Sequence, residues 1–156
     1  MEVTREQLEH YRPLNLNLTL ANGEEDILKV TDIVYSGLKL EPHNKSKTLN
    51  NLKVLILNLV INHYEDKFMF TGVHLNEKKY IASSRYNTNQ VGKSITKLIH
   101  SLDKVGYIDM YKGFRAAKFS RITRILPLDK LLKLVREQGI NPDLITHRPD
   151  TETIIC

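Results

Sequence analysis

The chain has very little cysteine and no long apolar segment, and these two shortages exclude several classes of protein. Its single cysteine, Cys156, is the last of 156 residues, so no disulfide can form within the chain, which suits a reducing compartment. The longest apolar run, Val54–Ile61, is interrupted by Asn58 and is far too short to cross a bilayer. The first residues are charged and lack the apolar core of a signal peptide. We therefore expect a cytoplasmic protein without a membrane partner.

Residue patterns for metal, nucleotide or acid–base chemistry are also scarce. The six histidines are scattered without ligand spacing, and no cysteine lies near them. Gly92, Lys93 and Ser94 match the end of a phosphate-binding loop, but that loop needs a glycine five positions before Gly92, where this chain has Asn87. The sequence therefore predicts no cofactor, no bound nucleotide and no enzymatic activity.

Basic residues are concentrated in one part of the chain. The 48 residues from Lys78 to Ile125 contain eleven Lys or Arg and only two acids, Asp103 and Asp109, whereas the rest of the chain carries more acids than bases. A basic half joined to an acidic half indicates a polyanionic partner at a defined surface. A well-solvated basic surface would have the same composition, so charge alone leaves both interpretations open.

A short helix and a strand are predicted near the N-terminus. Thr4 and Gln7 fit a capping box, which opens a helix that must end before Pro13. Residues 14–20 alternate strictly between apolar and polar, which is typical of a strand with one buried face.

A helix and a loop should follow this strand. Residues 24–36 begin with acids, which favour the N-terminus of a helix. Residues 37–47 are polar and contain Pro42, so we expect a loop or hinge there. The apolar residues of this segment that fall on a helical pattern are Ile27, Leu28, Val30, Ile33 and Val34.

Residues 49–66 form the most apolar segment of the chain. They are rich in Leu, Ile and Val on almost every side, which predicts a central buried helix, with a strand over residues 54–61 as the alternative. A short strand is predicted over residues 67–73. Residues 74–88 have no clear pattern, and a short helix there is an open alternative.

A long amphipathic helix over residues 91–105 is the clearest pattern. Asn87 and Gln90 fit a capping box at its start, and Gly106 fits a left-handed stop at its end. Its apolar stripe consists of Val91, Ile95, Leu98, Ile99, Leu102 and Val105. The opposite face is expected to carry Asn89, Gln90, Lys93, Ser94, Thr96, Lys97 and Lys104, with His100 also on the polar side.

A basic ribbon is predicted after this helix. Residues 107–111 and 120–126 alternate as strands do, and residues 112–118 would join them. A last helix over residues 128–138 is expected to end at Gly139, before a poorly ordered tail. The basic residues of the ribbon are Lys112, Arg115, Lys118, Arg121 and Arg124.

The long helix closes with an LxxxGYI pattern, made by Leu102, Gly106, Tyr107 and Ile108. Together with the basic ribbon, this closure resembles the winged helix-turn-helix family, in which it ends the recognition helix and opens the first strand of the wing. The family's second helix should stand before Asn87, where the sequence shows no clear helical pattern. Residues 84–108 and 120–125 are also similar to the N-terminal part of larger phage and bacterial proteins of replication type.

The resemblance implies an α+β winged helix-turn-helix fold with three parts. The winged-helix domain would cover residues 49–138. An N-terminal arm with a short helix, a strand and a helix would precede it over residues 1–48, and a tail would follow over residues 139–156.

The resemblance also implies binding to double-stranded DNA, in transcription control or replication initiation, with a homodimer as an open possibility. A helix fits the major groove, where Asn or Gln can contact adenine and Lys can contact guanine, while wing arginines suit phosphates or a narrow minor groove. The candidate DNA-binding residues are Arg85, Asn89, Gln90, Lys93, Ser94, Lys97, Lys112, Arg115, Lys118 and Arg121.

Two other functions remain open at this point. A protein–protein interaction module on the same fold would use the basic face to meet an acidic partner. A binder of RNA or single-stranded DNA would need aromatic side chains that stack on bases. Tyr107, Tyr111 and Phe114 are the candidates for such stacking, and packing within the core or the ribbon is the alternative role for them.

Overall fold

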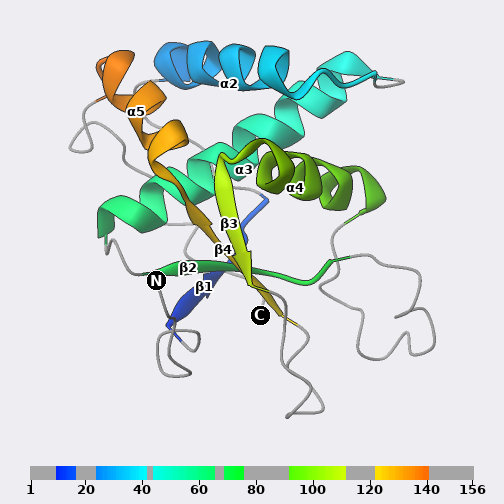
Figure 1. Cartoon of the computed structure of the whole chain (residues 1–156), viewed down its shortest axis with the longest axis vertical. Coiled ribbons are helices and arrows are strands. Elements are labelled where there is room, and N and C mark those ends of the chain that lie inside the picture. The colour runs from blue at the N-terminus through cyan, green and yellow to red at the C-terminus, as the bar shows by residue number, and fades with distance from the viewer. Residues whose placement is uncertain are drawn as a thin grey trace.

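The computed structural model describes residues 10–16, 24–41, 44–65, 69–75, 92–111 and 122–140. In these residues four helices pack against a four-stranded mixed sheet, so the fold belongs to the α+β class. Figure 1 shows the helices gathered on one side of the molecule with the sheet beneath them. The elements are β1 (Tyr11–Pro13), α2 (Glu24–Leu38), α3 (Lys45–Glu65), β2 (Phe70–Val73), α4 (Lys93–Val105), β3 (Ile108–Tyr111), β4 (Thr123–Pro127) and α5 (Asp129–Glu137).

The strands lie in the order β1-β2-β4-β3. β1 runs parallel to β2, whereas β4 is antiparallel to both β2 and β3. The predicted ribbon is confirmed in its strands, because β3 pairs with β4 from Ile108 opposite Pro127 to Tyr111 opposite Arg124. Residues 112–121, which join the two strands, lie outside the described residues.

α3 is the central helix, as the apolar segment predicted, and the alternative of a strand over residues 54–61 is wrong. Its middle is buried on nearly all sides because α2, α4 and the sheet surround it (Figure 1). Asn44 caps its start by accepting a hydrogen bond from Lys47 N at 3.1 Å. Helix therefore replaces part of the loop expected over residues 37–47, and residue 48, where the N-terminal arm was predicted to end, lies inside α3.

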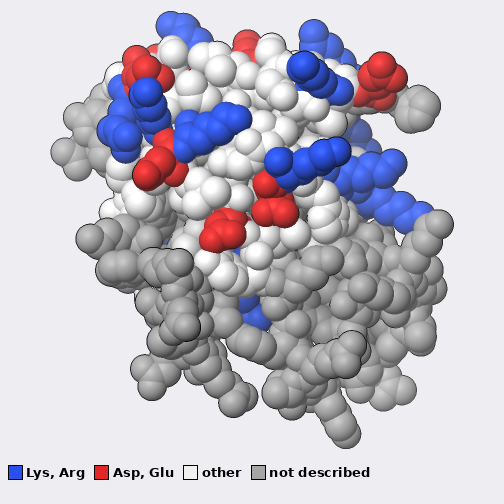
Figure 2. All heavy atoms as spheres, in the orientation of Figure 1, with Lys and Arg blue, Asp and Glu red and all other residues white. Residues whose placement is uncertain are grey.

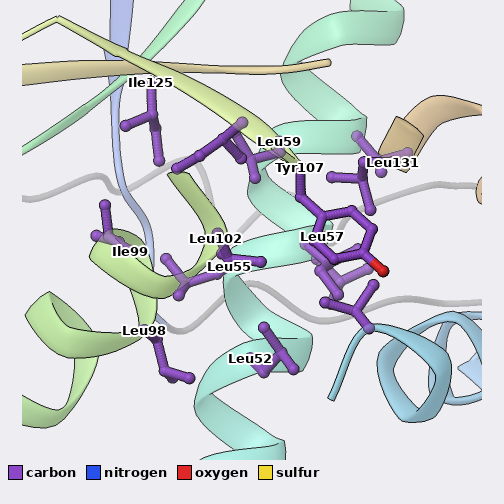
Figure 3. Packing of buried hydrophobic residues seen from close by; sticks show 14 of the residues in the cluster. Leu52, Leu55, Leu57, Leu59, Leu98, Ile99, Leu102, Tyr107, Ile125 and Leu131 are labelled. Atoms are coloured by element: carbon purple, nitrogen blue, oxygen red, sulfur yellow. The ribbon is translucent and has the colours of Figure 1, made fainter. Parts of the chain in front are cut away.

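One apolar core joins all four helices to the sheet. Figure 3 shows side chains of α4 and β4 pointing toward the leucines of α3, with Tyr107 lying between α3 and α5. Burying one such aliphatic side chain contributes about 1.5–3 kcal/mol to stability. The core members labelled in that view are Leu52, Leu55, Leu57, Leu59, Leu98, Ile99, Leu102, Tyr107, Ile125 and Leu131.

α2 contributes fewer side chains to this core than its pattern predicted. Ile27, Val30 and Val34 are buried, but Leu28 is 43% exposed and Ile33 is 40% exposed. α2 packs on α3 through one face only, and the backbone geometry of a helix carries Leu28 and Ile33 away from that face. The helix predicted here is confirmed, and only part of its apolar pattern belongs to the core.

The N-terminal strand lies earlier than predicted. The structure places it at Tyr11–Pro13, whereas residues 14–16 are outside the strand and residues 17–20 lie outside the described part. Its hydrogen bonding to β2 continues only as far as Leu14, whose N–H donates to Gly72 O at 2.8 Å. Of the strand predicted over residues 14–20, the described part, residues 14–16, is therefore not a strand.

The side chain of Asn58 explains where this strand stops. Its Nδ2 donates to Asn15 O at 2.9 Å, and its Oδ1 accepts from Asn15 N at 2.9 Å. The amide of Asn58 thus satisfies both backbone groups of Asn15 in the way that a neighbouring strand would. The asparagine that interrupts the apolar run of α3 therefore ties the N-terminal segment to the central helix.

α4 ends at Gly106 as the sequence predicted. Gly106 has a φ of 93° in the left-handed region, and its N–H donates to Leu102 O at 3.1 Å. Tyr107 N also donates to Leu102 O, at 2.9 Å, so the chain turns directly into β3.

Replacing Gly106 with alanine should lower the free energy of unfolding by about 1 kcal/mol. A Cβ at this position would meet no atom within 4 Å, so the expected loss comes from the left-handed backbone alone. Gly106→Asn is the matched control and should lose less, because asparagine adopts this conformation more readily. Urea unfolding measures both variants, and equal stability of Gly106→Ala and the parent would contradict the backbone argument.

Candidate nucleic-acid interface

α4 separates apolar and basic side chains onto opposite sides. Ile95, Leu98, Ile99 and Leu102 are buried in the core, as predicted. On the outer side, basic side chains recur at i, i+4, i+7 and i+11, which places them in one line along the helix. We call this line the basic stripe; its members are Lys93, Lys97 and Lys104, which are exposed, and His100, which is half-buried.

Only three of the ten predicted DNA-binding residues lie in the described part of the chain, and all three are exposed on α4. Lys93 and Lys97 belong to the basic stripe, and Ser94 lies beside it in the first turn. His100 and Lys104 were placed on the polar side but not among the binding residues; their helical spacing from Lys93 and Lys97 is the signal that includes them. The predicted residues outside the described part are Arg85, Asn89, Gln90, Lys112, Arg115, Lys118 and Arg121.

The start of α4 differs from the sequence prediction. The helix begins at Lys93 with Gly92 as its N-cap and no side-chain cap, so a capping box made by Asn87 and Gln90 at its start is wrong. Asn89 and Gln90 precede the helix and are not part of its outer face. Local sequence alone does not tell whether a helix begins at a cap signal or several residues after it.

Thr96 also differs from its prediction, because it is buried although it was expected on the outer face. Its Oγ1 donates to Gly92 O at 3.2 Å, and its backbone N–H donates to the same oxygen at 3.0 Å. A hydroxyl bonded back to the preceding turn needs no water, so the threonine can lie against the core.

The surface charge is uneven over this side of the molecule. Figure 2 shows Lys and Arg side chains at the right of the view, where Figure 1 places the start of α4, and others at the upper left and the top. Acidic side chains lie nearer the middle. Asp103 is an exposed acid of α4 itself. The first two turns of the helix are therefore its most basic part.

Tyr107 is a core residue and not part of a stacking platform. It is 4% exposed, and its burial raises the pKa of its hydroxyl. The Nζ of Lys130 lies 4.5 Å from the centre of its ring, and the same Nζ donates to Val105 O at 3.1 Å. A cation at the C-terminal carbonyls of α4 is favourable, so Lys130 holds the end of α4 against α5.

Tyr111 is also engaged within the protein. Its ring meets Phe70 edge to face with centroids 5.5 Å apart, and its hydroxyl donates to Asp109 Oδ2 at 2.6 Å. Asp109, one of the two acids in the basic part of the chain, therefore accepts a hydrogen bond from this tyrosine. Phe114, the third aromatic candidate, lies outside the described residues.

The hydrogen bond to Asp109 raises the pKa of Tyr111 to about 12, with burial and the charge of Asp109 acting in the same direction. Because the folded-state pKa lies above the ordinary tyrosine value of 10.0, the stabilisation is fully present below pH 10 and is lost as the pH rises toward 12. Asp109→Asn should therefore shift tyrosinate formation at Tyr111 to lower pH.

Ultraviolet absorbance of tyrosinate follows this titration, with Tyr111→Phe identifying the step that belongs to Tyr111. The interpretation is wrong if Tyr111→Phe leaves the late part of the titration unchanged, or if Asp109→Asn does not advance it.

Arg124 is not available to bind phosphate, although it was predicted as part of the basic ribbon. It is only 4% exposed, and its Nη1 donates to Ile122 O at 2.7 Å. Its guanidinium carbon lies 5.1 Å from the ring centre of Tyr11 in β1. Pairing of β4 with β2 therefore turns this arginine into a structural contact between the ribbon and the N-terminal strand.

Comparisons with known proteins returned no relative. No family model matches the chain, and no curated protein or solved structure matches it either. Within the described ranges, no helix combines the length and the apolar character needed to cross a membrane. The same ranges contain no group of three or more His, Cys, Asp or Glu side chains placed to hold a metal ion.

Proposed function

We propose that this protein binds double-stranded DNA as a winged helix-turn-helix domain, with α4 as the recognition helix and the β3–β4 ribbon as the wing. The order of elements supports this proposal. α4 passes through Gly106 directly into β3, and β3 returns antiparallel to β4. β2, which follows α3, completes the sheet beside β4. The family's second helix would lie before Asn87, among residues 76–86, which are outside the described part.

The basic stripe is the observation that carries the proposal. A helix with one apolar face held in the core presents its other face as a rigid rod, and the major groove admits such a rod. Lys93, Lys97 and Lys104 extend from that face into solvent, where they can neutralise phosphates or reach base edges.

Single-stranded nucleic acid is less well supported as the ligand. Its recognition without sequence preference relies on exposed aromatic rings. Tyr107 is buried, and Tyr111 packs on Phe70. Two of the three aromatic candidates therefore have roles within the fold.

Lys93→Ala and Lys97→Ala should each weaken binding to duplex DNA. Each should also lower the slope of log affinity against log salt by about one unit for every phosphate that the lysine neutralises in the parent. Lys133→Ala removes an equal exposed charge from another helix, α5, and is the matched control. Titration of each variant with duplex and single-stranded DNA at several salt concentrations measures both effects.

The proposal fails if the parent shows no salt-dependent affinity for duplex DNA, or if the two stripe variants bind as tightly as the parent at low salt. Binding to an acidic protein with no affinity for duplex would favour the interaction-module alternative. Arg115→Ala and Arg121→Ala extend the same titration to the ribbon, where loss of affinity without loss of sequence preference is expected.

We propose that this DNA binding serves either transcription control or replication initiation in the cytoplasm. A homodimer would place two copies of α4 on half-sites related by two-fold symmetry. Sedimentation of the protein with duplex DNA would measure how many chains bind each site.

A further inference from the structure

The outer side of α4 offers hydrogen-bond donors almost exclusively. Lys93, Lys97 and Lys104 lie along the basic stripe, and an ammonium group donates but cannot accept. His100, in the same line, donates in both of its protonation states and can also accept when neutral. No carboxylate or carboxamide side chain lies on this line.

Asp103 is the one carboxylate among the described residues of α4, and it lies off the basic stripe. Successive residues of an α-helix are turned by about 100°, so Asp103 projects about a quarter-turn away from Lys104. Asp103 thus lies on the same side of α4 as the buried Thr96, at the edge of the basic stripe and not within it. It also belongs to the last turns of the helix, whereas base contacts come from the N-terminal residues of a recognition helix.

The four bases differ in what they present to such a donor surface. In the major groove guanine offers two acceptors, N7 and O6, and thymine offers one acceptor, O4, beside a methyl group. Adenine pairs one acceptor with a donor, and cytosine offers only a donor. Adenine and cytosine are matched by Asn, Gln, Asp or Glu, and Asn89 and Gln90, which were predicted to contact adenine, are not part of α4. The donor-rich stripe therefore complements guanine.

We propose, on the basis of the DNA-binding function proposed above, that α4 selects sites with guanine in the major groove and that Lys97 is the residue that determines this preference. Lys97 is exposed, stands one turn into the helix and lies at the middle of its basic part. Lys93, at the first position of the helix, stands beside the free backbone N–H groups of the helix N-terminus, which favour a phosphate.

The first experiment selects sites from random duplexes and then replaces the guanines of the strongest site, one at a time, with 7-deazaguanine. This base keeps Watson–Crick pairing but lacks the N7 acceptor. The selected sites should contain guanine, and replacement at a contacted position should weaken binding about tenfold. Selected sites without guanine, or full affinity for every 7-deazaguanine duplex, would overturn the guanine preference.

The second experiment exchanges the donor for an amide. Lys97→Gln should remove the sensitivity to 7-deazaguanine at one position and admit adenine there, because a carboxamide both donates and accepts. Lys133→Gln on α5 is the matched control and should keep the parent's preference. Both lysines are exposed, and thermal unfolding verifies that each variant is folded.

The outcomes separate this inference from the function on which it rests. Salt-dependent duplex binding that ignores 7-deazaguanine leaves DNA binding intact and shows that the lysines contact phosphate only. Absence of duplex binding overturns both proposals. A loss of guanine preference in Lys133→Gln as well as in Lys97→Gln would show that net charge, and not the position of Lys97, governs the preference.

Discussion

Leu102→Ala should lower the free energy of unfolding by about 2–5 kcal/mol, the largest loss expected from a single substitution in α4. The side chain of Leu102 is fully buried in the core that joins α4 to the other helices. Truncation to alanine removes its packing and leaves a cavity, because the surrounding side chains of a close-packed core relax only partly. Urea unfolding measures the loss.

Lys104→Ala, two residues further along the same helix, is the control for this substitution. Lys104 is exposed, so its replacement should change stability by less than about 0.5 kcal/mol. A loss below about 1 kcal/mol for Leu102→Ala would contradict the packing of α4 described above. The comparison also separates the apolar face, which stabilises the fold, from the basic face, which is proposed to bind DNA.

Gly72→Ala should cost about 1–3 kcal/mol, because its Cβ would enter occupied space. Gly72 lies in β2 between Pro13 of β1 and Arg124 of β4. An added Cβ would overlap Tyr11 Cδ2, stand 2.8 Å from Tyr11 Cε2 and 3.0 Å from Ile122 Cγ2. The ring of Tyr11 has little freedom to move, since Arg124 lies over it.

A double-mutant cycle tests whether the Tyr11 ring causes this loss. In a Tyr11→Ala background the cost of Gly72→Ala should be smaller, because the ring that the new Cβ meets is absent. Gly92→Ala is the glycine control without a clash, because the nearest atom to its Cβ would be Ser94 Oγ at 4.0 Å. Its loss of about 0.5–1 kcal/mol, expected because alanine is a poorer N-cap for α4, should be the same with and without the Tyr11 ring. Strictly additive losses in the cycle would show that Tyr11 does not restrict position 72.

Periodicity predicted the helices and the main strands because the buried residues of one such element recur at a regular spacing along it. Leu98, Ile99 and Leu102 recur at helical spacing, and Gly106 marks the end of that helix with a residue suited to a left-handed turn. The same reasoning did not determine which side of α2 faces the core. Leu28 and Ile33 fit an apolar pattern, but only the packing of α2 on α3 determines which apolar residues become covered.

Features that depend on contacts between distant parts of the chain could not be predicted from local sequence patterns. The end of β1 depends on Asn58, which is 43 residues from its partner Asn15. In the sequence Arg124 resembles the other basic residues of an exposed ribbon, and only the pairing of β4 with β2 places it over the ring of Tyr11. At the candidate interface the lysines of α4 were predictable because one helix carries them all, whereas the start of that helix was not, because Gly92 gives no side-chain cap.

The two ends of the sheet should assemble at different times as the chain folds. Tyr11 pairs in parallel with Phe70, so β1 can join β2 only after α2 and α3 have brought the chain back, whereas β3 and β4 are joined by a short link. Closing the longer loop costs more chain entropy, and non-local pairings of this kind form slowly. We therefore expect β1 to dock last and its amide protons to exchange with solvent early. Until β1 docks, β2 is an open edge, and unpaired edges of this kind are where a partly folded chain pairs with another chain.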